Sequence, residues 1–183
     1  MPVTITGLSH HSSPVELRER FAFTESQIIE ALNQIRKKGI ANEAMILSTC
    51  NRVEIYAVPK EPNKAFTQEL SQFLCDFHDI NENPGDALYS FNDSNSIDHL
   101  FRVSCGIDSM VLGETEILGQ LKQSYKLALE QKATGPILNK IFQKAFNVAK
   151  LIRTKTQIQR GSISVSSVAV ELAESIFDSL ESQ

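Results

Sequence analysis

The sequence predicts an α+β fold in which a ferredoxin-like sheet, built as a split βαβ unit, is followed by a helical subdomain and the start of a long connecting helix. Up to residue 91, strand and helix signals follow the order strand, helix, strand, strand, helix, strand. From Ser94 onward, apolar residues recur at helical spacing. With 183 residues, 42% hydrophobic and 22% charged, the chain is long enough to bury a sizeable core.

The chain begins with signals for one strand and one helix. Residues 3–6, Val-Thr-Ile-Thr, are typical of a strand. Residues 24–38 repeat apolar side chains at helical spacing, and Thr24 is a natural N-cap with Gln27 placed for a capping box. These residues predict the first strand and the first helix of the split βαβ unit.

The rest of the sheet is expected from the next fifty residues. Residues 44–48 and 53–58 predict two strands separated by a short polar turn. Pro62 can open a second helix, and a short strand is expected at 88–91. The apolar stripe of this second helix consists of Phe66, Leu70, Phe73, Leu74 and Phe77.

The second half is expected to be helical. A helix begins near Ser94, and two more are predicted at 120–131 and 135–155, with Gly135-Pro136 as the break between them. Ser162 restarts a helix with an apolar stripe of Val165, Val168, Ala169, Leu172, Ile176 and Leu180.

These boundaries predict a catalytic and substrate-recognition domain over 1–160 and the start of a linker helix over 161–183. An apolar stripe on a terminal helix must be covered. We interpret it as a truncated connection into a missing domain; the alternative is a last helix that docks on its own core.

Composition limits the location and the redox state. No apolar stretch approaches the roughly 18 residues that a membrane span needs, and the amino end lacks the layout of a signal peptide, so we expect a cytoplasmic protein without membrane contact. The three cysteines, Cys50, Cys75 and Cys105, form no C-x-x-C pair and their number is odd. They are expected to be free thiols.

The net charge of −4 is unevenly distributed. The chain carries −8 up to Glu116 and +4 from Ile117 onward. Residues 139–160 contain no acidic side chain, which predicts a positive face suited to a polyanion. The alternative is a solvated helix flank. The basic residues of this segment are Lys140, Lys144, Lys150, Arg153, Lys155 and Arg160.

Cys50 is the candidate nucleophile. It lies in the polar turn between two predicted strands, next to Asn51 and Arg52, so its sulfur is expected to be accessible. A neighbouring guanidinium favours the thiolate and lowers the pKa of a cysteine. Cys75 lies on an apolar helix stripe and Cys105 at a helix end, and both are expected to be small buried hydrophobes.

The histidines show no metal-binding spacing. His10, His11, His78 and His99 form no H-E-x-x-H motif, so no metal site is predicted. His99 could serve as a general acid or base if the fold brings it near Cys50. A lone helical histidine is more often a satisfied core or surface residue, and that alternative stays open.

Residues 106–120 form an unusual loop. Its glycines permit tight turns, and it matches neither the P-loop pattern nor a βαβ dinucleotide fingerprint. A polar, partly acidic loop suits an ammonium group and a small polar ligand, whereas the alternative is a purely structural connection between helices. Its candidate ligand-binding residues are Ser109, Glu114, Thr115, Glu116 and Gln120.

Four blocks, in this order, resemble the glutamyl-tRNA reductase family, and together they cover essentially the whole chain. The second contains Cys50 within Leu-Ser-Thr-Cys-Asn-Arg-Val-Glu-Ile-Tyr. The first is Gly-Leu-Ser-His-His-Ser-Ser-Pro-Val at 7–15 with Leu-Arg-Glu at 17–19; the others are 106–120, and 142–156 followed by 162–167. Four blocks in order are far more specific than any one of them.

The resemblance implies an NADPH-dependent oxidoreductase that reduces the aminoacyl ester of glutamyl-tRNA to glutamate-1-semialdehyde, the first committed step toward tetrapyrroles such as porphyrins. It implies that Cys50 attacks the ester carbonyl, releases tRNA and holds a glutamyl thioester. His99 matches a position important for activity, for which proton transfer to the leaving ribose oxygen is one candidate role.

The resemblance also implies the substrate site. Thr49, Asn51 and Arg52 match positions that line the glutamate site, with Arg52 suited to bidentate pairing with the substrate's side-chain carboxylate. Other substrate-recognition positions of the family match Ser109, Glu114, Thr115, Glu116 and Gln120.

The main departure from the family is length. A full reductase continues into a Rossmann-type NADPH domain and a helical dimerisation domain, which we expect to be absent from these residues. The chain should then form the thioester without reducing it, and should be monomeric although the whole enzyme is a homodimer. Expected partners are glutamyl-tRNA, contacted in part by the basic segment, and glutamate-1-semialdehyde aminomutase.

Two other interpretations remain. The chain could be a recognition module that binds tRNA or a partner protein, with Cys50 inert. An unrelated cysteine hydrolase would need a buried His or Asp that orients the thiol, and it leaves residues 106–120 unexplained.

Overall fold

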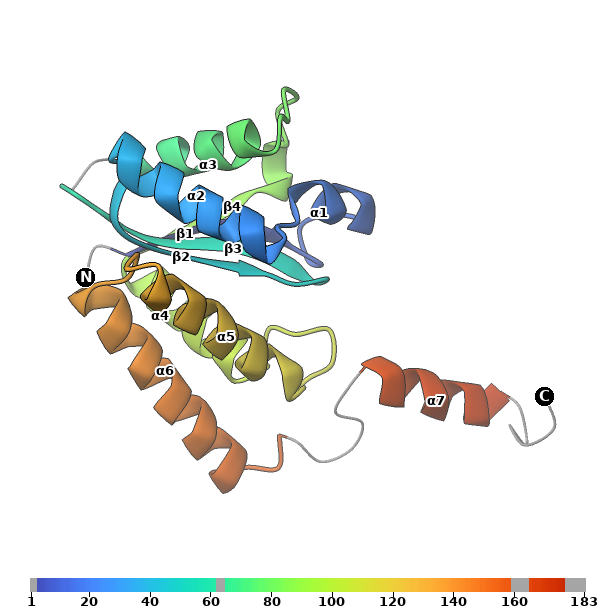
Figure 1. The fold of residues 1–183 in the computed structure, drawn as a ribbon. Helices are drawn as coiled ribbons and strands as arrows, with labels where there is room; N and C mark the ends of the chain where they lie inside the picture. The colour runs from blue at the N-terminus through green and yellow to red at the C-terminus, as the bar shows by residue number, and fades with distance from the viewer. Residues whose placement is uncertain (1–2, 62–64, 159–164, 177–183) are drawn as a thin grey trace.

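A computed structural model describes residues 3–61, 65–158 and 165–176, and its first half forms one sheet (Figure 1). The four strands lie in the order β2-β3-β1-β4, and all neighbours are antiparallel. This order confirms the predicted α+β fold with a ferredoxin-like sheet. The strands are β1 (Thr4–Ser9), β2 (Ala41–Ser48), β3 (Arg52–Pro59) and β4 (Tyr89–Asn92).

Helices cover both faces of the sheet (Figure 1). On one face lie α1 (Val15–Phe21), α2 (Glu25–Lys38) and α3 (Phe66–Phe77). On the other lie α4 (Ser94–Ser104), α5 (Glu116–Glu130) and α6 (Pro136–Lys155). A strand covered on both faces buries its side chains in both directions, and all residues of β3 except Pro59 are buried.

The sequence predicted most elements to within a few residues. The Thr24–Gln27 capping box is present, since the Gln27 amide N–H donates to Thr24 Oγ1 and the Thr24 amide N–H to Gln27 Oε1. Helix α1 was not predicted, because its seven residues are too few for a periodic signal. Helix α5 begins at Glu116, about one turn earlier than expected. Pro62 lies outside the described residues.

The last described helix is α7 (Val165–Ile176), and its large apolar side chains that the structure describes are exposed. Val168, Leu172 and Ile176 are 41%, 58% and 64% exposed. The alternative in which this helix docks on its own core is therefore not what the structure contains. The predicted boundary between 160 and 161 lies outside the described residues and stays a prediction.

A buried carboxylate joins the two halves of the chain. Glu43 on β2 accepts hydrogen bonds from the backbone N–H groups of Ile137 and Leu138, at 3.1 and 2.7 Å. These belong to the first turn of α6, where the helix dipole favours a negative charge. The contact fixes the start of α6 on the edge strand of the sheet. No helix among the described residues is long and apolar enough to cross a membrane.

Gly7 lets β1 and β3 approach closely. A Cβ at this position would lie 2.2 Å from the backbone oxygen of Val53 and 2.8 Å from the Cα of Glu54. Replacing Gly7 by alanine should therefore force the two strands apart and cost about 1–3 kcal/mol of unfolding free energy. Urea unfolding measures this loss.

Gly119 provides the matched control. It lies within α5, and a Cβ added to it would meet nothing within 4 Å, so Gly119→Ala should stabilise by up to about 1 kcal/mol. Equal effects of the two substitutions would contradict the steric argument.

Candidate functional site

A tight turn between β2 and β3 presents Cys50. Thr49 Oγ1 accepts hydrogen bonds from the backbone N–H groups of Asn51 and Arg52, at 3.2 and 3.1 Å. The Thr49 amide N–H donates to the Arg52 carbonyl at 2.9 Å. This closed turn leaves Cys50 exposed, whereas Cys75 and Cys105 are buried. The predictions of three free thiols and of two buried ones are confirmed.

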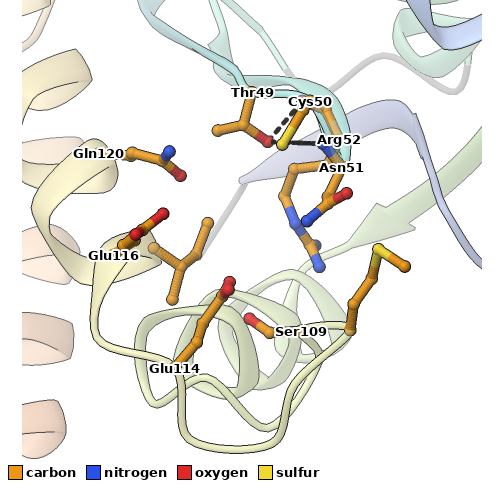
Figure 2. A pocket seen from close by; sticks show the side chains of 10 residues that line it. Thr49, Cys50, Asn51, Arg52, Ser109, Glu114, Glu116 and Gln120 are labelled. Carbon is orange, nitrogen blue, oxygen red and sulfur yellow. Dashed lines mark hydrogen bonds between the residues drawn. The ribbon is translucent and has the colours of Figure 1, made fainter. Parts of the chain in front are cut away.

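A cavity of about 200 Å³ lies between this turn and the segment that connects α4 to α5 (Figure 2). Its volume is below the 300–1,000 Å³ typical of sites for drug-sized ligands, so it suits a group of amino-acid size. Its lining brings together most of the predicted site residues. The lining residues are Thr49, Cys50, Asn51, Arg52, Ser109, Met110, Glu114, Glu116, Ile117 and Gln120.

Polar groups face the turn from the opposite wall of the cavity (Figure 2). Glu114 is only 8% exposed, and the hydroxyl of Ser109 is buried without a hydrogen-bond partner in the structure. A buried hydroxyl in that state is available to a ligand. The carboxylates of Glu114 and Glu116 make this wall acidic, which favours a cationic group such as an ammonium.

Thr115, which was predicted to bind substrate, does not line the cavity. It is exposed and is the N-cap residue of α5, with its backbone in the right-handed helical region. The first two turns of α5 point Glu116 and Gln120 toward the cavity instead (Figure 2). A role of Thr115 in substrate binding stays a prediction, because Thr115 is not among the residues that line the cavity.

Arg52 forms part of the cavity floor and is 1% exposed. Its Nη1 donates to Glu54 Oε1 at 2.9 Å, and its Nη2 donates to Asp108 Oδ2 at 3.0 Å and to the Asp108 backbone carbonyl. Burial by itself lowers the Arg52 pKa, but the neighbouring groups, Glu54 first and then Tyr89, Tyr56 and Asp108, together outweigh it and the net shift is upward. The guanidinium stays charged.

These contacts correct the simple picture of Arg52 as a charge available to the thiol of Cys50. Both terminal nitrogens already hold carboxylate groups, so any substrate carboxylate must share the guanidinium with Glu54 and Asp108. Asp108 was not predicted as a site residue. It is one of two acidic groups on Arg52, and its other oxygen lies 3.7 Å from His11 Nε2.

Glu54 is the centre of a buried hydrogen-bond network. Besides Arg52, its carboxylate accepts from the hydroxyls of Tyr56 and Tyr89, both at 2.5 Å, and from His99 Nε2 at 2.7 Å. Burial alone raises the Glu54 pKa, but Arg52 and His99 outweigh burial and hold the pKa well below its usual range. Burial and the adjacent Glu54 charge raise the pKa of both tyrosines.

His99 therefore does not reach the cavity. It is buried, its Nε2 faces Glu54, and its ring stacks on Phe91 with centroids 4.6 Å apart. His99 is not among the residues that line the cavity, and its role as a general acid or base stays a prediction. Helix packing against the sheet turns His99 toward the buried carboxylate of β3 instead.

Comparisons with known proteins identify the family. Residues 6–156 match the family model described as glutamyl-tRNAGlu reductase, N-terminal domain. The chain belongs to this family. The match spans nearly the whole described structure, and it includes both walls of the cavity.

Individual relatives are similar over almost the full chain. The glutamyl-tRNA reductase of Pseudoalteromonas translucida is 44% identical over 182 residues, which is 99% of this chain and 43% of the relative. A Neisseria meningitidis serogroup C reductase is 43% identical over 97% of this chain and 41% of its own length. The solved reductase from Methanopyrus kandleri has a TM-score of 0.76 and 32% identity, covering 97% of this chain and 41% of that one.

The chain thus spans about two fifths of the length of the relatives it matches. Within the described residues, no group of three or more His, Cys, Asp and Glu side chains could hold a metal ion. The described sheet is antiparallel throughout and has none of the parallel strand crossovers on which dinucleotides bind. The residues that the structure describes do not fit NADPH.

The exposure of Cys50 predicts selective alkylation. Iodoacetamide should modify Cys50 much faster than Cys75 or Cys105, because only the first sulfur is accessible. Peptide mass spectrometry over a time course measures the three rates. Equal modification of all three thiols in the folded chain would contradict the described turn.

The buried network predicts an acid-dependent stability. Glu54→Gln places amide hydrogens against Arg52 and should cost about 3–5 kcal/mol of unfolding free energy at neutral pH. Because the folded pKa of Glu54 is depressed, its stabilisation is present above the unfolded value of about 4.3 and is lost as the pH falls below it. Urea unfolding between pH 7 and pH 3 tests this.

The exposed Glu19 supplies the control for this series. Glu19→Gln should leave the stability at pH 7 and its pH dependence near those of the parent chain. The claim fails if Glu54→Gln retains the acid sensitivity of the parent chain in full.

Proposed function

We propose that this chain is the catalytic N-terminal domain of a glutamyl-tRNA reductase, in which Cys50 accepts the glutamyl group from glutamyl-tRNA. The observation that carries the proposal is one exposed thiol at a cavity of amino-acid size, lined by hydroxyl, amide and carboxylate groups. Family membership supplies the substrate class.

The proposed step is an acyl transfer. The Cys50 thiolate attacks the ester carbonyl carbon, the bond from that carbon to the ribose oxygen breaks, and the ribose oxygen leaves with a proton. A new C–S bond holds the glutamyl group as a thioester. A thioester accepts hydride more easily than an oxygen ester. In the full enzyme NADPH would supply the hydride, and residues other than those described would bind it.

The cavity offers partners for each part of a glutamyl group. The buried carboxylate of Glu114, supported by Glu116, suits the α-ammonium group. The Ser109 hydroxyl, which has no partner within the described residues, and the amides of Asn51 and Gln120 suit the carbonyl and side-chain oxygens. Arg52 would bind the substrate carboxylate while it keeps Glu54 and Asp108.

His99 is then a positioning residue and not a catalytic one. Its hydrogen bond to Glu54 helps to fix the carboxylate that orients Arg52. The proton for the leaving oxygen must come from water or from a cavity residue.

A second part of the proposal is that the basic segment of α6 binds tRNA. Lys140, Lys144, Lys150 and Lys155 are exposed on α6 and suit a phosphate backbone. Arg153, by contrast, turns toward the loop of the cavity. Arg160 lies outside the described residues. Contact with the aminomutase, dimerisation of the whole enzyme and a cytoplasmic location stay expectations from the family.

Labelling with radioactive glutamyl-tRNA tests the acyl transfer. We expect acid-stable label on the protein that hydroxylamine releases, and we expect Cys50→Ser to remove it while Cys75→Ser keeps it. If Cys50→Ser carries as much label as the parent chain, the catalytic proposal is refuted. Binding of glutamyl-tRNA without any label would instead favour the recognition module, to which the exposed lysines of α6 point.

A further inference from the structure

Two arginines hold the segment between α4 and α5 from opposite sides. Arg52 on β3 binds Asp108 near the start of the segment. Arg153 in the last turn of α6 donates through Nη2 to the backbone carbonyls of Glu114 at 3.1 Å and Thr115 at 3.5 Å. The wall of the cavity that carries Ser109 and Glu114 is therefore anchored both to the sheet and to α6.

The placement of Arg153 is costly for a surface charge. It is only partly exposed, its Nε is buried without a hydrogen-bond partner among the described residues, and burial lowers its pKa. An exposed basic residue on the same helix, such as Lys150, avoids that cost by facing water. The desolvation of Arg153 is offset by its contacts to Glu114 and Thr115, so the position of these carbonyls depends on it.

The chain that leaves α6 lies against the same segment. Gly113 has a φ of +79°, and a Cβ on it would lie 2.0 Å from the backbone oxygen of Ile158. The Gly113 amide N–H donates to the Gly106 carbonyl at 2.9 Å, which closes the segment into a compact loop. The exit of α6 and the wall of the cavity thus pack directly on each other.

We propose that Arg153 is a positioning residue of the substrate pocket. By holding the carbonyls of Glu114 and Thr115, it sets where the Glu114 carboxylate lies in the cavity, and it couples the course of the chain after α6 to the placement of the bound glutamyl group at Cys50. This inference rests on the proposed acyl transfer to Cys50. It assigns to Arg153 a role distinct from that of the neighbouring lysines, which face solvent.

The test compares Arg153→Met and Arg153→Lys with Lys150→Met, the matched control on the same helix. Each variant is titrated with radioactive glutamyl-tRNA, and the maximal labelling rate of Cys50 is separated from the half-saturating concentration. Arg153→Met should lower the maximal rate about ten- to hundredfold, as expected for a small misplacement at the reacting group, with a half-saturating concentration close to that of the control. Arg153→Lys, which keeps a donor, should recover part of the rate.

Amide hydrogen exchange at residues 113–116 gives a readout that needs no activity. The amide hydrogens of residues 113–116 should exchange faster in the Arg153→Met variant than in the Lys150→Met variant. The exchange rates in β3 should be the same in both variants. A rate and an exchange pattern equal to those of Lys150→Met would overturn the inference, and so would a change in half-saturating concentration alone, which marks a tRNA contact.

Two further outcomes are kept separate. If Arg153→Met does not fold, Arg153→Lys decides: labelling slower than that of Lys150→Met at an unchanged unfolding temperature supports the inference, and labelling equal to that of Lys150→Met overturns it. If the parent chain takes no label, the proposed function fails, and hydrogen exchange alone decides whether Arg153 orders the loop.

Discussion

The site depends on one buried charge pair, that of Arg52 and Glu54. Both side chains are almost completely inaccessible to solvent. Removing two charges from water costs several kcal/mol per ion, and this cost is offset only when other groups fill the remaining hydrogen-bonding capacity of the pair. Here it is filled, because Glu54 also accepts from Tyr56, Tyr89 and His99. The network ties strands β3 and β4 to helix α4, so that elements from both halves of the chain meet behind the cavity.

The charge pair also explains the arrangement of the pocket. Arg52 lies directly after the turn that exposes Cys50, and its side chain passes into the interior and meets Asp108 on the other wall. Arg52 therefore links the turn of Cys50 directly to the segment that carries the acidic wall. Away from the cavity, Glu43 fixes the start of α6 on β2. The two contacts hold the helical half against the sheet at separate points.

Much of this could be predicted from the sequence, because local patterns determine it. The capping box of α2, the Gly-Pro break before α6 and the polar turn at Cys50 each depend on a few neighbouring residues. The exposure of Cys50 followed from its polar turn, and the burial of Cys75 and Cys105 from an apolar helix stripe and a helix end. The cavity residues came from the family resemblance, whose blocks supplied both walls, since no local pattern tells that residues near 50 and 114 will meet.

What could not be predicted are the partners of charged groups across long sequence separations. Glu54 is the one acidic residue of β3, and with Arg52 two positions earlier it is a visible sign of buried charge, but its partner His99 is 45 positions away. His99 was assigned to catalysis on resemblance, whereas its packing on Phe91 directs it to Glu54. Asp108 and Arg153 gave no signal, because an acid in a polar loop and a base in a basic helix both look like ordinary surface residues.

The two halves of the molecule contribute different groups to the site, and the difference follows from how rigid each half is. Cys50, the proposed nucleophile, is carried by a tight turn between two hydrogen-bonded strands, so its position is fixed by the sheet. The groups that would recognise the substrate lie on a loop, whose backbone is held through Arg52, Arg153 and the packing of Gly113 on Ile158. A thiol that must meet a carbonyl carbon needs the rigid element, because small misplacement there is costly. A wall that would admit a substrate and release a product tolerates the looser one.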